Sequence, residues 1–189
     1  SSGVSPAPSR NTGYASSSPS TPILSKPLLV LDTNVVLDLL HFDDATARPL
    51  RQALESGHVR CVATAATLDE LQRVLGYPEF ALDAAQQAAL FARYQKWARL
   101  TEAGVGDAGL PHKGTPIHYG LKPVWSRMPR CSDPDDQKFI ELAAAANAQG
   151  LVSKDRAVLK LRRRCAPYFR VMTPAEAVRW LHDVSGVAA

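Results

Sequence analysis

Residues 28–36 of the chain read LLVLDTNVV, and the first four of them decide the fold. A short continuous apolar run, Leu28 to Leu31, is typical of a strand that is buried on both faces. Such strands occur in parallel sheets that helices cover on both sides. The run therefore predicts that the folded part of the chain begins at Leu28 with an inner strand.

Outward from that strand, helical and strand patterns alternate along the chain. Strand patterns occupy residues 60–63, 99–102, 151–153 and 169–172, and helical patterns occupy residues 35–42, 47–55, 65–75, 83–98 and 134–148 and the segments that begin at Arg156 and Pro174. This alternation is typical of βαβ units. It predicts an α/β fold, a three-layer α/β/α sandwich with a central parallel sheet.

Two segments have a different composition from this alternating part. Ser, Pro, Gly and Thr dominate residues 1–27, which bury too little apolar surface to offset the entropy of ordering. We expect a disordered tail there, followed by one domain over residues 28–184. Residues 103–131 are rich in Pro and Gly and predict a long loop insertion, which in a compact domain is usually functional or mobile.

Charge and cysteine content narrow the classes of function. The formal net charge of +4 and the pI near 9.1 permit an anionic partner such as nucleic acid, although the excess is modest. Cys61, Cys131 and Cys165 show no zinc spacing and no disulfide framework, which favours reduced thiols in a cytoplasm. No apolar run reaches about 18 residues, so we expect neither a membrane span nor a secretion signal.

Two acidic residues follow predicted strands. Asp32 comes directly after the first strand, and Asp155 comes shortly after the strand at 151–153. Ligands of open parallel sheets bind outside the carboxyl ends of the strands, which makes both acids candidates for a site. Each also fits an ordinary helix N-cap, because Asp is common there. Together, the two acids favour a functional role.

Two further acids lie on helical patterns. Glu70 falls beside Val74 on the margin of an apolar helix face, whereas Asp69 points more nearly to solvent, although an ordinary surface glutamate fits Glu70 as well. Asp136 shares the apolar face of its helix with Phe139 and Ile140. An alternative is that the Asp-Pro-Asp-Asp run simply caps this helix, but capping explains an inward Asp136 poorly.

Carboxylates gathered at one sheet edge repel each other, and a divalent cation relieves the repulsion. Their hard oxygen atoms favour Mg²⁺ or Mn²⁺. The five histidines show no H-E-x-x-H or similar spacing, which argues against a zinc enzyme. The sequence also contains no G-x-S-x-G elbow and no P-loop or G-x-G-x-x-G phosphate cradle.

The segments LLVLDTNVVLDLL, LDEL, DPDDQKFIELAAAA and LVSKD stand in the order seen in PIN-domain nucleases, and the resemblance covers roughly residues 28–182. The segments YPEF at 77–80, DPDD at 133–136 and VMTPAE at 171–176 resemble the branch of toxin components of bacterial toxin–antitoxin pairs. The chain departs from this branch in carrying Ser153-Lys154 where Thr-Gly is common and in a longer loop before Asp133.

The resemblance implies a Mg²⁺- or Mn²⁺-dependent endoribonuclease, often dimeric, with a possible antitoxin protein as partner. Its catalytic and metal-binding acids would be Asp32, Glu70, Asp136 and Asp155, and its supporting residues would be Asn34, Ser153 and Asp133. The proposed reaction is hydrolysis of RNA phosphodiesters, in which the bound cations polarise the phosphate and activate a water.

Basic and aromatic residues offer candidate RNA contacts. Those expected to bind RNA are Lys154, Arg156, Arg162, Arg163, Trp125 and Arg127; His112, Lys113, Tyr119, Lys122 and Arg130 of the loop and Lys160 and Arg164 of the basic helix extend the set. The alternative is that the loop is a disordered insertion and that the basic run is a solvated helix face.

Two other functions stay open at this stage. A phosphatase with an aspartyl nucleophile also places an Asp after its first strand, but it usually needs a second Asp where this chain has Asn34. A non-catalytic interaction module with the same fold would bind RNA or a protein without cutting; the four acids argue against it.

Overall fold

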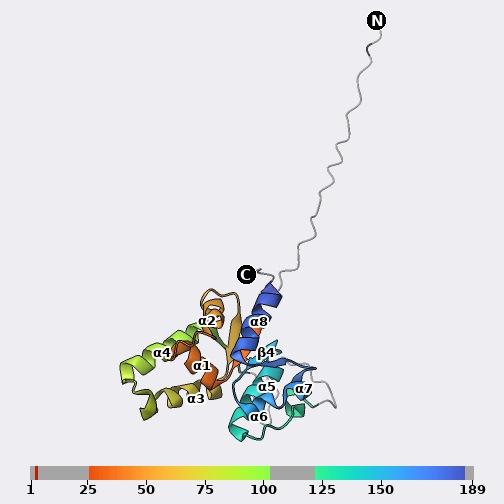
Figure 1. Ribbon diagram of the computed structural model, residues 1–189. Helices are drawn as coiled ribbons and strands as arrows, with labels where there is room; N and C mark the ends of the chain where they lie inside the picture. The colour runs from red at the N-terminus through yellow and green to blue at the C-terminus, as the bar shows by residue number, and fades with distance from the viewer. Residues whose placement is uncertain (1–2, 4–25, 103–121, 186–189) are drawn as a thin grey trace.

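The computed structural model describes Gly3, residues 26–102 and residues 122–185, of which Ser185 is described by its backbone alone. The predicted tail lies outside the described residues except for Gly3, Lys26 and Pro27. Residues 103–121 of the predicted loop also lie outside them. Figure 1 shows the helices gathered around a central sheet.

The sheet contains five parallel strands in the order β3-β2-β1-β4-β5. They are β1 (Leu28–Leu31), β2 (Arg60–Ala63), β3 (Ala98–Leu100), β4 (Gly150–Val152) and β5 (Arg170–Met172). The inner strand predicted from residues 28–31 is β1, and it occupies the centre. It pairs with β2 on one side and with β4 on the other.

Helices cover both faces of this sheet. One face carries α1 (Thr33–Leu40), α2 (Arg48–Glu55), α3 (Ala65–Leu75), α4 (Ala84–Trp97) and α8 (Pro174–Ser185), whereas the other carries α5 (Gln137–Ala145), α6 (Arg156–Leu159) and α7 (Arg162–Cys165) (Figure 1). The predicted three-layer α/β/α sandwich is therefore confirmed. Among the described residues, no helix is both long and apolar enough to cross a membrane.

Side chains of β1 alternate between the two layers of core. Leu29 and Leu31 pack with α1 to α4 and α8, whereas Leu28 and Val30 pack with α5 to α7. All four are buried, and Leu29 has no exposed surface. A strand with two buried faces needs an apolar residue at every position, which is why the run is continuous and does not alternate with polar residues.

Caps set the helix boundaries. Helix α1 begins at Thr33, two residues before the predicted start, because the Asp32 carboxylate accepts a hydrogen bond from the backbone N–H of Val35 at 3.0 Å. Helix α3 begins after a capping box in which Thr64 and Thr67 bond each other's backbone N–H. Its bounds agree with the predicted 65–75.

Two predicted helices are wrong in their extent. The helix predicted over 134–148 is a 3-10 turn, η3 (Pro134–Asp136), followed by α5, and Asn147 leaves the helical conformation at φ 53°. Asp136 is thus the N-cap of α5 and does not lie within its first turn. The basic helix predicted from Arg156 is divided into α6 and α7.

The last part of the predicted loop is ordered against α5. Residues Val124–Arg127 form a 3-10 turn, η2, and the following Met128 is buried in the core beside α5. The buried Gln137 donates from Nε2 to the carbonyl of Pro129 at 3.2 Å and accepts at Oε1 from the backbone N–H of Cys131 at 2.7 Å. This side chain fixes the segment that leads into Asp133.

Because β1 is buried on both faces, we expect Leu29→Ala to lower the free energy of unfolding by about 2–5 kcal/mol, through lost burial and the cavity left behind. The matched control is Leu100→Ala on the edge strand β3, where the side chain is 60% exposed. The control should change stability by less than about 0.5 kcal/mol. Urea unfolding measures both; equal effects would contradict the central placement of β1.

Candidate metal centre

The order in which strands are added to the sheet reverses between β1 and β4. It runs from β1 outward to β2 and β3 and then returns to β4 on the other side of β1. Leu31 pairs with Val152, so the residues that follow, Asp32 and Ser153, lie side by side at the carboxyl edge. In open α/β sheets this switch point is where ligands bind.

Asp32 is held rigidly at this edge. It is 3% exposed, one carboxylate oxygen accepts the N–H of Val35, and the other accepts the hydroxyl of Ser153. Burial raises the pKa of Asp32, and the hydrogen bond from Ser153 opposes that rise. The carboxylate is thus fixed in one orientation by groups that favour its charged form.

Ser153 joins two of the predicted acids. Its side chain is fully buried, donates to Asp32 and accepts the backbone N–H of Asp155 at 3.1 Å. Asp155 in turn caps α6 by accepting the N–H of Ala157 at 2.8 Å. One hydroxyl therefore couples the end of β1 to the turn between β4 and α6.

Three acids converge beside this pair. Asp133, Asp136 and Asp155 each offer a carboxylate oxygen, and these oxygens lie within 4.8 Å of one another. Asp133 and Asp136 come from the turn η3, whereas Asp155 comes from the start of α6. Two segments that are distant in the sequence thus supply one acidic cluster.

Asp136 is the most perturbed of these groups. Burial raises the pKa of its carboxyl to about 7, and a hydrogen bond to Asp155 and the negative charges of Asp155, Asp133 and Asp32 act in the same direction. Its Oδ2 is buried and has no hydrogen-bond donor among the described residues. A buried carboxylate oxygen without a donor is costly unless a proton or a cation meets it.

The donor set fits a divalent cation such as Mg²⁺ or Mn²⁺. Oxygens that bind one ion at about 2.0–2.6 Å can lie at most about 4–5 Å apart, which agrees with the 4.8 Å limit of the cluster. The ligands are all carboxylates, which suit hard cations, and the unpartnered Oδ2 of Asp136 needs such a group. Asp133, Asp136 and Asp155 could hold the ion directly.

Glu70 lies outside this three-acid cluster. Its Oε1 accepts from the ammonium of Lys138 at 2.7 Å, and its Oε2 accepts the hydroxyl of Thr33. The sequence interpretation missed both partners, although each stands within two residues of a predicted ligand, Asp136 or Asp32. Glu70 therefore links α3 to the first turns of α1 and α5.

Lys154 and Asn34 stand within two residues of the predicted acids Asp155 and Asp32 in the sequence. Lys154, one of the expected RNA contacts, forms an ion pair at 2.7 Å with Asp38, whose side chain is only 8% exposed. Asp38 was not predicted; the signal was a single acid within the apolar helix segment VVLDLL. Asn34 is exposed on the first turn of α1, and its backbone N–H hydrogen-bonds the Asp32 carboxylate.

The other expected RNA contacts are divided between core and surface. Trp125 is half-buried and packs against the core on the α5 side, whereas Arg127 is exposed. Arg156, Arg162 and Arg163 are exposed on α6 and α7, and Arg162 pairs with Glu176 at 2.6 Å. His112, Lys113 and Tyr119 lie outside the described residues.

The three cysteines are free thiols that are poorly suited to nucleophilic catalysis. Burial raises the pKa of Cys61 to about 12 and that of Cys165 to about 11. Burial also raises the pKa of Cys131, and the nearby charges of Asp136, Asp155 and Asp133 add to the rise. A reactive cysteine needs a lowered pKa, so this acidic edge works against a thiolate.

Comparison with known proteins gives a family and a fold. The PIN domain family matches residues 28–157. A solved structure, VapBC2 from Rickettsia felis bound to a DNA fragment from their promoter, contains a chain with a TM-score of 0.50 and 12% identity, covering 76% of this chain and 96% of that one. At this identity the likeness concerns the fold alone. A search of curated proteins gave no match.

The raised pKa of Asp136 predicts that Asp136→Asn stabilises the metal-free protein. Because the folded pKa is about 7 and the usual value is 3.8, the wild type loses stability as pH rises between these values. Asparagine does not ionise, so the variant does not lose stability over this pH range through position 136. In EDTA at pH 8 we expect a gain of about 1 kcal/mol, which raises Tm by about 2–4 °C, and a much smaller gain at pH 4.

Asp135→Asn is the matched control, because Asp135 is an exposed acid in the same turn and is not one of the three clustered acids. Thermal unfolding at both pH values measures the three proteins. If Asp136→Asn destabilised the protein at pH 8, or if the control gained as much, the carboxylate repulsion described above would be refuted.

Proposed function

Because this chain belongs to the PIN domain family, we propose that it is a metal-dependent endoribonuclease that hydrolyses RNA phosphodiester bonds. The observation that carries the proposal is the cluster of Asp133, Asp136 and Asp155 beside the switch point, with a buried Oδ2 of Asp136 that lacks a donor. Such an oxygen-only site suits Mg²⁺ or Mn²⁺.

In this proposal the acids act as a preorganised ligand set. A bound divalent cation would supply charge to polarise the phosphate and to acidify a water. Asp32 lies beside the clustered acids, where Ser153 and the Val35 amide hold its two oxygens in place, and its negative charge adds to the potential that a cation would meet. Asp136 would give up the proton that its raised pKa retains near neutral pH, so loading the site would release a proton.

The remaining residues set charge and orientation. Glu70 belongs to the proposed site as the acid contributed by α3, where it orients the Lys138 ammonium at 2.7 Å. Lys138 places a positive charge two residues from Asp136, where a phosphate would approach. Asp38 holds Lys154 and so anchors the turn that carries Ser153 and Asp155.

We propose further that the chain is the toxin component of a bacterial toxin–antitoxin pair and acts in the cytoplasm. The support is the sequence resemblance of YPEF and VMTPAE to that branch, with a partner antitoxin as its consequence. The likeness to a chain of VapBC2 supports the fold on which this rests. RNA is the substrate in this proposal.

The aspartyl phosphatase is disfavoured by the surroundings of Asp32. A nucleophilic carboxylate must reach the phosphorus of its substrate, but Asp32 is 3% exposed and both of its oxygens are engaged in hydrogen bonds. The exposed residue two positions on is Asn34, which cannot act as the acid of that reaction.

The test is cleavage of a fluorescent single-stranded RNA with Mn²⁺, with Mg²⁺ and with EDTA. We expect the wild type to cut only with a metal and Asp136→Asn to lose more than about 100-fold in rate, since the metal contributes several kcal/mol to transition-state stabilisation. Asp135→Asn, the neighbouring acid that is not part of the three-acid cluster, should stay within about threefold of the wild type.

Four outcomes would count against the proposal. Cutting that persists in EDTA would refute the metal requirement, and full activity in Asp136→Asn would refute the site. Hydrolysis of a generic phosphatase substrate without RNA cutting would favour the second enzyme class. RNA binding with no cutting under any metal would favour a non-catalytic module.

A further inference from the structure

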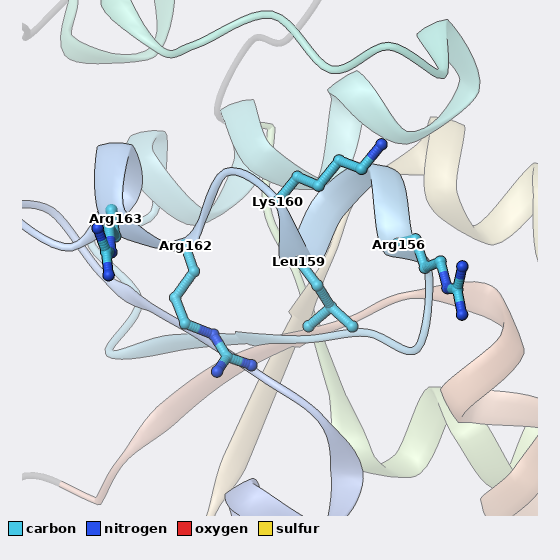
Figure 2. Close-up of a pocket in the computed structure, with 5 residues that line it drawn as sticks. All are labelled: Arg156, Leu159, Lys160, Arg162 and Arg163. Atoms are coloured by element: carbon cyan, nitrogen blue, oxygen red, sulfur yellow. The ribbon is translucent and has the colours of Figure 1, made fainter.

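A basic pocket lies over α6 and α7, the two helices that follow Asp155 in the chain. It is a shallow, open hollow of about 470 Å³ that is lined by Arg156, Leu159, Lys160, Arg162 and Arg163. Figure 2 shows Leu159 in the middle, with the cationic side chains extending around it. Four of the five lining residues are cationic, which concentrates positive potential in one hollow.

Few acids offset these charges. Arg162 forms an ion pair with Glu176 at 2.6 Å. The Glu176 carboxylate therefore offsets the charge of Arg162 and not those of the other three cations of the pocket. Within residues 26–102 and 122–185, no ion pair is made by Arg156, Lys160 or Arg163. Like charges around one hollow repel each other, and a bound anion removes that repulsion.

The place of the pocket in the chain relates it to the metal centre. Asp155 caps α6, and Arg156 is the first residue of that helix. With a rise of about 1.5 Å per residue, Lys160 lies roughly 7 Å further along the chain direction than Asp155. A strand carries one phosphate per nucleotide, so the phosphates next to one held at Asp155 lie a comparable distance away.

We propose that this pocket binds a backbone phosphate of the RNA substrate one or two nucleotides from the bond that is cut. The inference rests on the proposed nuclease function and adds a second phosphate subsite to it. A strand whose phosphodiester reaches Asp136 and Asp155 necessarily carries further phosphates on either side. Arg156, Arg162 and Arg163 present guanidinium forks, which match phosphate oxygens in pairs.

The chemistry of the pocket also determines whether it can distinguish one RNA sequence from another. Contacts to phosphates carry no sequence information, so the pocket contributes affinity and register and leaves base choice to other residues. The affinity it contributes depends on salt, because each phosphate that a cation neutralises releases counterions. The slope of a salt titration therefore reports how many phosphates the cations of the protein neutralise.

The experiment measures binding of a fluorescent single-stranded RNA oligonucleotide by fluorescence anisotropy at several NaCl concentrations, in EDTA, which withholds the metal that the proposed cutting requires. The test variant is Lys160→Ala/Arg163→Ala. The control is Lys96→Ala/Arg99→Ala, which removes the same charges from exposed positions at or beside the opposite edge strand β3. Circular dichroism and thermal unfolding check that both variants keep the fold.

We expect the slope of log K against log[NaCl] to become shallower by about 0.7 in the test variant, the change that the loss of one phosphate contact gives on a single strand. The control should keep the wild-type slope. An unchanged slope in the test variant, or an equal change in the control, would overturn the proposal.

Two further probes separate other anions from RNA. Suppose that inorganic phosphate binds the wild type tightly and that the double variant leaves RNA binding unchanged. The pocket would then be a site for free phosphate, and the inference would be overturned. If the double variant weakened binding of polyglutamate and left RNA binding unchanged, the pocket would instead be a site for an acidic protein segment, which would also overturn the inference. Because none of these measurements requires cutting, wild-type RNA cleavage tests the proposed function separately.

Discussion

Mutual repulsion of carboxylates at the carboxyl edge of β1 and β4 is the constraint on which the site depends. The central position of β1 brings Asp32 beside Ser153, and the turns η3 and α6 bring Asp136 and Asp155 to the same place. Ordinary folding would separate or neutralise such acids. Here burial and neighbouring charges hold the pKa of Asp136 near 7, and the fold retains a strain that a cation would relieve.

Within residues 26–102 and 122–185, two lysines that neighbour the cluster in the sequence pair with acids other than the three clustered ones. Lys138 is held by Glu70 on one side, and Lys154 is held by the buried Asp38 on the other. Each ammonium therefore has its own acid, which leaves the unpartnered Oδ2 of Asp136 free for another ligand. The basic pocket of α6 and α7 continues the same arrangement outward, where positive groups outnumber acids.

Much of this arrangement follows from the sequence. The apolar run at 28–31 identifies the central strand, because only a strand buried on both faces requires it, and acids after two strands identify the edge at which acidic side chains gather. The sequence could not show that Asp133 faces the cluster or that Glu70 meets Lys138, since both depend on how the turn η3 and helix α5 approach α3. Helical periodicity likewise could not reveal the 3-10 turn at Pro134, because an α-helix and a 3-10 helix differ little over one turn.

Direct titration of the apo protein with Mn²⁺, without RNA, tests the central claim most simply. We predict that isothermal titration calorimetry shows binding to the wild type, stronger at pH 8 than at pH 6 because Asp136 must lose its proton, and at least about tenfold weaker binding in Asp136→Asn. Asp135→Asn should bind as the wild type does. Equal affinity in the wild type and Asp136→Asn, or binding that is insensitive to pH, would contradict the account of this edge as a cation site.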